Sequence, residues 1–328
     1  MTSSTTTGQV TARLRSSRRE RESLSARLVE FVNRTPVHLA LILISVVWLV
    51  PTVGLLVTSF RTRSDILSTG WWNVFVQGRF TFENYDRILF SAGSTYSLGQ
   101  NFINSIIITV PSTLLPVFLG SLAAYAFAWL KFRWRDWIFM LIVGLLVIPL
   151  QMTFVPILQL YNDPLGPIRE LFNNVGLAVS VPKFQVTSTF LGLWIAHTAY
   201  GLPFAIFLLR SFFAALPRDL FEAAKMDGSS ELGIFFRIVL PLSVPALAAI
   251  TIFQFLWVWN DLLVALIYAQ SPNLQPLTVG ISTMLSTYGP EWDIMSAGAF
   301  VTMMVPLIVF FSLQKYFVTG LLAGSVKT

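Results

Sequence analysis

Long runs of apolar residues, separated by shorter polar stretches, are the main pattern along this chain of 328 residues. Six of the runs contain about 20 residues or more, the length that an α-helix needs to cross the hydrocarbon core of a bilayer. The pattern predicts an all-α integral membrane protein with six transmembrane helices, at 37–60, 101–130, 137–158, 188–210, 241–268 and 294–318.

The basic residues predict the orientation of these spans. An even number of spans places both termini on one side, and sixteen of the 22 Lys and Arg residues lie there, in 1–36, 131–136, 210–237 and the C-terminal end. Because Lys and Arg near span ends are retained on the cytoplasmic side, the N and C termini are predicted to be cytoplasmic. Segment 1–36 is then a basic cytoplasmic arm that precedes the six-span domain at 37–318, and 319–328 is a cytoplasmic tail.

Every predicted span contains at least one proline. A proline removes a backbone donor and tends to kink its helix, and in lipid the freed carbonyl group must find a partner inside the bundle. Kinked spans are more typical of a transport bundle that changes conformation than of a static membrane anchor. The prolines are Pro51, Pro111, Pro116, Pro149, Pro156, Pro203, Pro245 and Pro306.

Composition and motifs restrict the chemistry of the chain. Charged residues make up 12% of it, against about 25% in a soluble protein. With no Cys and only two His residues, thiolate sites are excluded and a histidine metal site is not expected. None of the five lysines follows a glycine, which excludes the phosphate-binding loop G-x-x-x-x-G-K-[ST]. The chain is therefore predicted to be no enzyme and to bind no metal or cofactor itself, and its net charge of +6 is a topology signal rather than a sign of nucleic-acid binding.

An ion-coupled secondary carrier is the alternative class. Such carriers place ionisable groups or broken helices near the middle of the membrane. Asp261 is the single acidic residue inside a predicted span, so the support for this alternative is thin.

The loop between the fourth and fifth spans predicts two short helices. Pro217 suits the first turn of a helix, and Gly228 suits the left-handed turn that ends it. A second helix then starts near Ser229 or Ser230 and continues to Pro241. An apolar side of the first helix indicates contact with a protein partner or with the bilayer, and it consists of Leu220, Phe221, Ala224 and Met226.

A motif in this loop resembles a known family. Glu222-Ala223-Ala224 is followed after three residues by Gly228, and after nine more by Ile238-x-Leu240-Pro241. The spacing is similar to the EAA motif of the membrane subunits of binding-protein-dependent ABC importers. The resemblance implies that 211–240 is a coupling loop that docks on an ATPase subunit, through Leu220, Phe221, Glu222, Ala223, Ala224, Met226, Asp227 and Gly228.

Two further stretches are similar to carbohydrate-uptake permeases, specifically the six-span partner subunit of the maltose type. They are Trp259-Asn260-Asp261 and the end Gln314-Lys315-Tyr316 to Lys327. The resemblance covers about 37–328 and implies a type I ABC importer permease fold. In relatives the C-terminal tail reaches between the ATPase subunits, and a frayed end is the alternative.

The resemblance also implies partners and a location. A second, homologous permease completes a heterodimer, two ATP-binding subunits use ATP and Mg, and an extracytoplasmic sugar-binding protein docks on the other side. The complex lies among membrane lipid in the cytoplasmic (inner) membrane of a bacterium or archaeon. The expected cargo is a sugar, with di- or oligosaccharides, including α-glucosides, as the first candidates and sugar-like osmolytes or glycerol phosphates as the others.

Candidate contact residues follow from the chemistry of sugars, which amide and carboxylate groups and aromatic faces bind. The predicted substrate path consists of Gln151, Tyr200, Gln254, Trp257, Asn260 and Asp261. The alternatives are packing or lipid-facing aromatic rings and, for the last two residues, structural hydrogen bonds. The turn before the last span resembles the loop that reaches into the binding protein in maltose-type systems, with an interfacial anchor as its alternative. It consists of Tyr288, Gly289, Pro290, Glu291 and Trp292.

Overall fold

The computed structural model describes residues 35–90, 98–176, 185–288 and 291–325 of the chain. Within these ranges all regular secondary structure is helical, which confirms the predicted all-α class. The predicted N-terminal arm lies outside the described residues, except for its last two positions.

Four of the six predicted spans are continuous helices that are long and apolar enough to cross a membrane. The first is an N-terminal helix, Thr35–Ser59. The second is α5 (Gly99–Trp129) and the fourth is α9 (Phe190–Phe213). The last is α16 (Trp292–Ser325), which continues into the predicted tail, so the tail is helical at least as far as Ser325.

The third predicted span is bent. Helix α6 (Arg135–Leu145) and the segment Leu150–Asn162 meet at 97°. That segment begins with the 3₁₀ turn η2 (Leu150–Thr153) and continues as α7 (Phe154–Asn162). The break lies just before Pro149-Leu150, where a proline disfavours the helical conformation of its preceding residue.

The fifth predicted span, 241–268, is broken rather than continuous. The second helix predicted in the loop before it, Glu231–Leu242, meets Val244–Trp259 at 77°, and the helix of the span ends at Trp259 rather than at 268. The backbone then leaves the helix at Asn260 and Asp261. Asp261 therefore lies at a break rather than inside a helix. The pieces are α11 (Glu231–Ile234), the π-helical turn η3 (Phe235–Val239), α12 (Leu240–Leu242), α13 (Val244–Trp259) and α14 (Leu263–Tyr268).

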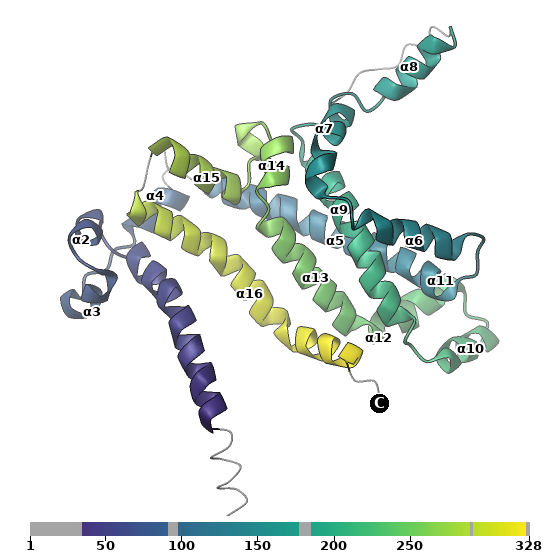
Figure 1. Cartoon of the computed structure of the whole chain (residues 1–328), viewed down its shortest axis with the longest axis horizontal. Helices are drawn as coiled ribbons and strands as arrows, with labels where there is room; N and C mark the ends of the chain where they lie inside the picture. The colour runs from purple at the N-terminus through teal and green to yellow at the C-terminus, as the bar shows by residue number, and fades with distance from the viewer. Residues whose placement is uncertain (1–34, 91–97, 177–184, 289–290, 326–328) are drawn as a thin grey trace, which may run out of the picture.

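Short helices occupy the two ends of the bundle. In Figure 1, α2, α3 and α4 lie at the left and α10 lies at the right, with α5, α13 and α16 running between them. Helix α8 projects away from the rest of the chain. These elements are α2 (Arg63–Ser68), η1 (Trp71–Asn73), α3 (Val74–Gln77), α4 (Glu83–Leu89), α8 (Gly166–Asn174), α10 (Arg218–Met226), η4 (Pro272–Leu274) and α15 (Leu277–Tyr288).

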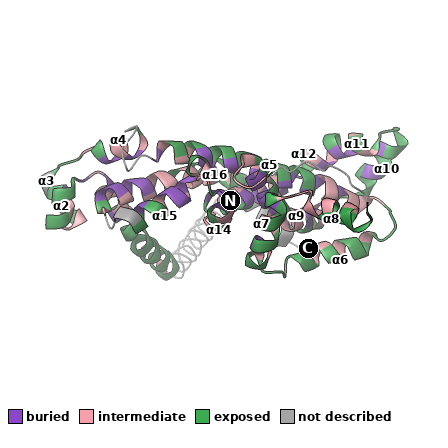
Figure 2. Ribbon diagram, turned by 90° about the horizontal axis from the view of Figure 1, so that it is seen from above, coloured by how far each residue is buried: buried purple, intermediate pink, exposed green. Residues whose placement is uncertain are grey.

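The core is formed where α5 packs against α9 and α13. Where α5 packs on α9, a Cβ atom placed on Gly120 would lie 2.8 Å from Cβ of Ala205. Small residues at such positions let helices in a membrane approach closely. Figure 2 shows buried residues in these central helices and also on α15 and α10.

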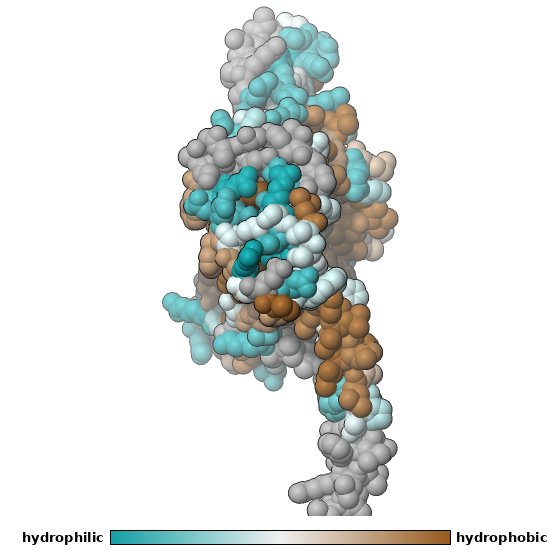
Figure 3. All heavy atoms as spheres, turned by 90° about the vertical axis from the view of Figure 1, so that its left-hand side faces the viewer, coloured by the Kyte–Doolittle hydropathy of each residue, from teal (hydrophilic) through white to brown (hydrophobic). Residues whose placement is uncertain are grey.

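The N-terminal helix packs little against the rest of the chain. Only 6% of its most apolar stretch is buried, and Trp48 is 75% exposed. This helix is almost wholly exposed in Figure 2, and its brown, hydrophobic surface lies below the teal, hydrophilic end of the molecule in Figure 3. An apolar helix of this kind requires lipid or another subunit around it.

Three of the prolines leave carbonyl groups that side chains of neighbouring helices satisfy. A proline at position i cannot donate to the carbonyl of residue i−4. In α5 the affected prolines are Pro111 and Pro116, and in α16 it is Pro306. The donors replace the missing bonds as follows: Trp194 Nε1 to Ile107 O at 2.9 Å, Gln254 Nε2 to Ser112 O at 3.3 Å, and Trp259 Nε1 to Thr302 O at 2.9 Å. At these three positions the predicted partners inside the bundle are present.

Candidate functional site

The two short helices predicted in the loop between the fourth and fifth spans are present, and they form an elbow at one end of the bundle. Helix α10 begins after Pro217, and Gly228 ends the elbow's first arm in the left-handed conformation, with φ of 75°. Ser230 caps α11 by accepting a hydrogen bond from the N–H of Gly233 at 3.1 Å. The turn signals of Pro217, Gly228 and Ser230 therefore acted as predicted, although α12 continues one residue past Pro241.

The two faces of α10 have different surroundings. Phe221 and Ala224 are buried in the core of this chain, so neither offers its side chain to a partner. On the other face Leu220 and Met226 are exposed, and Met226 exposes 82% of its surface. The remaining predicted coupling residues are also exposed, and they are Glu222, Ala223, Asp227 and Gly228.

Trp129, the last residue of α5, holds the inner face of α10. Its ring stacks on Phe221, with centroids 3.7 Å apart and planes at 17°. Its Nε1 donates to the carbonyl oxygen of Phe213 at the end of α9, at 3.0 Å. One side chain therefore joins α5, α9 and α10.

Glu231 makes a second connection. One carboxylate oxygen lies 2.8 Å from Nζ of Lys225 in α10. The other accepts a hydrogen bond from the hydroxyl of Tyr125 in α5 at 2.6 Å. Neither Tyr125 nor Glu231 was predicted as a site residue, because 106 positions separate them and no local pattern relates them.

A basic hollow of about 360 Å³ opens beside α10, between the ends of α5 and α9. Trp129 and Phe221 form its apolar wall. Four basic side chains and one acidic side chain also line it, and they are Lys131, Arg135, Arg218, Lys225 and Glu222.

The predicted substrate-path residues lie on several elements. Tyr200, on α9, connects two of these through its hydroxyl, which lies 3.0 Å from Oγ1 of Thr153 and 3.1 Å from the hydroxyl of Tyr268. Gln151 is exposed on η2, two residues before Thr153. Trp257, on α13, is about half exposed.

Gln254 has a structural role in the bundle. Its side chain is buried, bonds to Ser112 O in α5, and packs on Gly201 of α9. A Cβ atom on Gly201 would lie 2.4 Å from the amide nitrogen of Gln254. The amide is thus enclosed by three helices.

Asn260 and Asp261 shape the break after α13. Asn260 Nδ2 donates to Leu256 O at 2.8 Å. The carboxylate of Asp261 accepts from the N–H groups of Val264 and Ala265, at 3.3 and 3.1 Å, and so caps α14. His197 Nε2 lies 4.0 Å from the same carboxylate. These hydrogen bonds all lie within 256–265, and His197 on α9 is the neighbour that approaches the carboxylate from another span.

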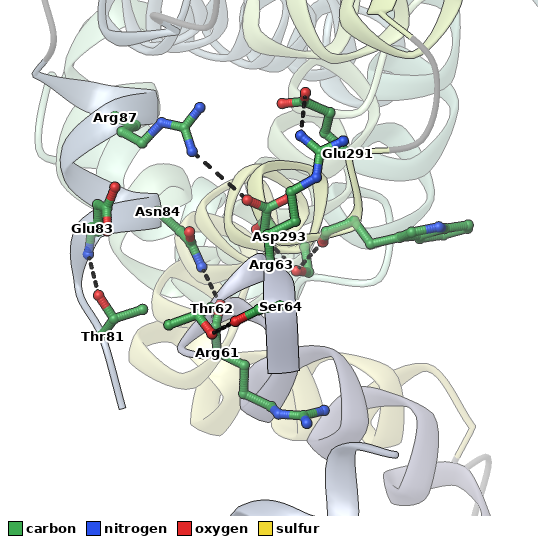
Figure 4. A network of polar contacts seen from close by, with 12 residues as sticks. Arg61, Thr62, Arg63, Ser64, Thr81, Glu83, Asn84, Arg87, Glu291 and Asp293 are labelled. Atoms are coloured by element: carbon green, nitrogen blue, oxygen red, sulfur yellow. Dashed lines mark hydrogen bonds and ion pairs between the residues drawn. The ribbon is translucent and has the colours of Figure 1, made fainter. Parts of the chain in front are cut away.

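Polar contacts join α2 and α4 to the start of α16 at the opposite end of the bundle (Figure 4). Arg63 pairs with Glu291 at 2.7 Å, and Arg87 lies 3.8 Å from the buried carboxylate of Asp293. Asn84 Nδ2 donates to the carbonyl oxygens of Ser59 and Arg61, at 2.9 Å each.

The predicted binding-protein loop lies at this same end. The stretch before it is the helix α15 (Leu277–Tyr288). Glu291 is held by its ion pair, and Trp292 is exposed at the start of α16. Tyr288 ends α15, while Gly289 and Pro290 lie outside the described residues. In the part of the chain that the structure describes, no group of three or more His, Cys, Asp or Glu residues could hold a metal ion.

A bundle of broken apolar helices with an exposed elbow at one end defines a membrane transport component. Residues 116–322 match the model of the family described as binding-protein-dependent transport system inner membrane component, and the chain belongs to this family. It is a multi-pass permease of the inner membrane and is no enzyme, because a separate ATPase subunit hydrolyses ATP.

Relatives with curated names support this membership. The chain is 47% identical over 307 residues to the osmoprotective compounds uptake permease protein GgtD of Synechocystis sp., with 92% of this chain and 95% of that protein covered. It is 47% identical over 250 residues to the alpha-glucoside transport system permease protein AglG of Rhizobium meliloti, with 76% and 61% covered.

A solved structure shows the same fold. The structure of a bacterial ABC transporter involved in the import of the acidic polysaccharide alginate contains a chain that matches with a TM-score of 0.62 and 20% identity. The match covers 89% of this chain and 98% of that one. The predicted ABC importer permease fold is confirmed, and none of these matches favours an ion-coupled carrier.

Proposed function

We propose that this chain forms half of the translocation path of an ATP-driven importer for small, uncharged glycosides, α-glucosides above all. The observation that carries the proposal is the equal identity, 47%, to a permease named for osmoprotective compounds and to one named for α-glucosides. A small neutral sugar with an α-glucosyl unit, such as trehalose or sucrose, satisfies both descriptions.

The candidate path groups suit an uncharged ligand. Gln151, Tyr200, Trp257 and Asn260 offer amide, hydroxyl and aromatic groups, and none carries a charge. Asp261 is the exception, but its carboxylate already accepts two backbone hydrogen bonds. An acidic oligosaccharide would meet no basic side chain among these residues, whereas a neutral sugar needs none.

The exposed face of α10 is the proposed contact with the ATPase. Leu220, Ala223 and Met226 provide apolar surface there, and Glu222 provides a charge. Asp227 and the left-handed Gly228 shape the end of the contact. The buried side chains of Phe221 and Ala224 face the core instead and hold α10 on the bundle.

The remaining partners follow from the two ends of the bundle. The end with α10 faces the cytoplasm, where the segment 319–328 reaches towards the ATPase subunits. The opposite end receives the binding protein, near Glu291 and Trp292. The second permease of the heterodimer, together with lipid, covers the exposed N-terminal helix.

Uptake by the assembled importer in lipid vesicles tests the cargo. Radiolabelled trehalose and sucrose are expected to accumulate only when ATP is supplied on the side of the membrane that carries the ATPase subunits. An alginate trisaccharide is the charged control. Accumulation driven by a proton gradient without ATP, or preference for the acidic sugar, would contradict the proposal.

Substitution at Glu222 tests the coupling contact. Glu222→Lys reverses a charge at the proposed ATPase contact and is expected to reduce ATP-dependent uptake at least tenfold, while the permease remains in the membrane. Glu222→Gln, which keeps the shape, is the matched control and is expected to have a smaller effect. Normal uptake by Glu222→Lys would remove this contact from the mechanism.

A further inference from the structure

Helix α5 is fastened to the coupling helix at one of its ends. Trp129 stacks on Phe221 of α10, and Tyr125 donates to Glu231, which also pairs with Lys225 of α10. The two contacts engage both the middle and the C-terminal end of α10. A displacement of α10 therefore meets α5 at two points rather than one.

The other end of α5 holds the backbone of a segment on the opposite side of the bundle, Asn273 to Leu277. Asn104 Nδ2 donates to the carbonyl oxygens of Asn273 and Gln275, at 2.8 and 3.1 Å. Asn101 Nδ2 donates to Gln275 O at 3.0 Å. The N–H of Leu277 donates to Oγ of Ser105 at 2.8 Å. This segment leads directly into α15.

The two fastened ends lie far apart on one continuous helix. Asn104 and Tyr125 are separated by 21 positions, which correspond to about 30 Å along an α-helix. Pro111 and Pro116 lie between them and would ordinarily weaken the helix. However, Trp194 and Gln254 donate to the two carbonyl groups that these prolines leave free.

We propose that α5 carries the displacement of the coupling helix across the membrane to the segment 273–277, with Tyr125, Trp129 and Asn104 as its positioning residues. The proposal rests on the coupling role of α10 proposed above. A movement that starts at α10 reaches the opposite face because one braced helix is hydrogen-bonded at both ends. The segment 273–277 then moves with the ATPase cycle although it lies on the far side of the bundle.

A reporter on the far segment tests the proposal in the assembled importer. Asn273→Cys places a thiol at an exposed position of a chain that has no cysteine, and partner subunits without cysteine keep the label specific. An environment-sensitive fluorophore there is expected to change its emission when ATP and Mg²⁺ are added. Absence of any ATP-dependent change would overturn the role of α5, while uptake by Glu222→Lys tests the coupling loop separately.

Single-group variants identify the path. Tyr125→Phe removes one hydroxyl, and Asn104→Leu keeps the branched shape of the side chain but removes its two donated bonds and the bond it accepts from Gln100. Both are expected to reduce the ATP-dependent signal and the transport per ATP hydrolysed at least threefold, while ATP hydrolysis continues. Tyr161→Phe is the matched control, because the hydroxyl of Tyr161 is also bonded but contacts Gly192 of α9.

The double variant Tyr125→Phe with Asn104→Leu distinguishes transmission of movement along α5 from two independent local defects. Effects at sites about 30 Å apart with no shared partner are normally independent. If α5 is one path, Tyr125→Phe with Asn104→Leu loses little more than the larger single loss, whereas independent defects multiply. Multiplying losses, or a normal signal in Tyr125→Phe, would overturn the proposal. Should Asn104→Leu fail to assemble, Asn101→Ala removes a bond at the same end and takes its place in this comparison.

Discussion

Gln254 Nε2 donates a hydrogen bond to the carbonyl oxygen of Ser112 at 3.3 Å, and that carbonyl is the one that Pro116 cannot satisfy within α5. The side chain of Gln254 is buried. A residue that resembled a sugar ligand in the sequence is therefore a substitute for a missing backbone donor. The same relationship recurs in Trp259, which serves the carbonyl left free by Pro306.

Removal of this amide tests its structural role. Gln254→Leu leaves Ser112 O without a partner in a buried site and is expected to cost about 1–3 kcal/mol of stability. In the background Pro116→Ala, the restored N–H of residue 116 bonds to the same carbonyl, so the cost of Gln254→Leu is expected to shrink. Thermal unfolding of the unsubstituted protein, the two single variants and the double variant measures the cost of Gln254→Leu in each background. Equal costs in both backgrounds would contradict the structural role.

Four of the six spans could be predicted from the sequence as continuous helices, because an uninterrupted apolar run of sufficient length determines each of them. The elbow could be predicted because Pro217, Gly228 and Ser230 carry local conformational signals. The break at Asn260 and Asp261 could not, since the apolar residues that follow it continue the hydropathy of the span.

The contacts that hold the coupling helix were also beyond the sequence. Which side of α10 faces inwards depends on Trp129, which is 92 positions away from Phe221 in the chain and stacks on it only in the fold. The apolar residues of α10 were therefore predicted as one contact surface, although the structure divides them between the core and the exterior.

Gly228 is expected to tolerate only residues that accept a left-handed backbone. A Cβ atom there would meet nothing within 4 Å, so the cost of a substitution comes from its φ of 75° rather than from a clash. Gly228→Val is expected to lose about 1–2 kcal/mol locally and to reduce ATP-dependent uptake, and Gly228→Asn is expected to retain most of it. Uptake assays at equal membrane abundance compare the two. Equal uptake by both variants would show that the turn conformation has no role.

Trp129 combines two contacts that substitutions can separate. Trp129→Phe keeps a ring against Phe221 but loses the hydrogen bond to Phe213 O, whereas Trp129→Ala loses both. Protease cleavage within α10 is expected to be fastest in Trp129→Ala and intermediate in Trp129→Phe, because α10 is released from the core in that order. Unchanged cleavage in Trp129→Ala would mean that the stack does not hold α10.

The approach of α5 to α9 at Gly120 gives a prediction with a built-in suppressor. Gly120→Ala would bring its Cβ atom to 2.8 Å from Cβ of Ala205, which is closer than real Cβ atoms come, so one helix must shift. Overpacking of this kind typically costs 1–3 kcal/mol. Ala205→Gly removes the opposing atom and is expected to recover most of the lost stability when combined with Gly120→Ala. Thermal unfolding and ATP-dependent uptake of the double variant measure the recovery, and a double variant no better than Gly120→Ala would show that the contact at Ala205 does not limit the packing of α5 on α9.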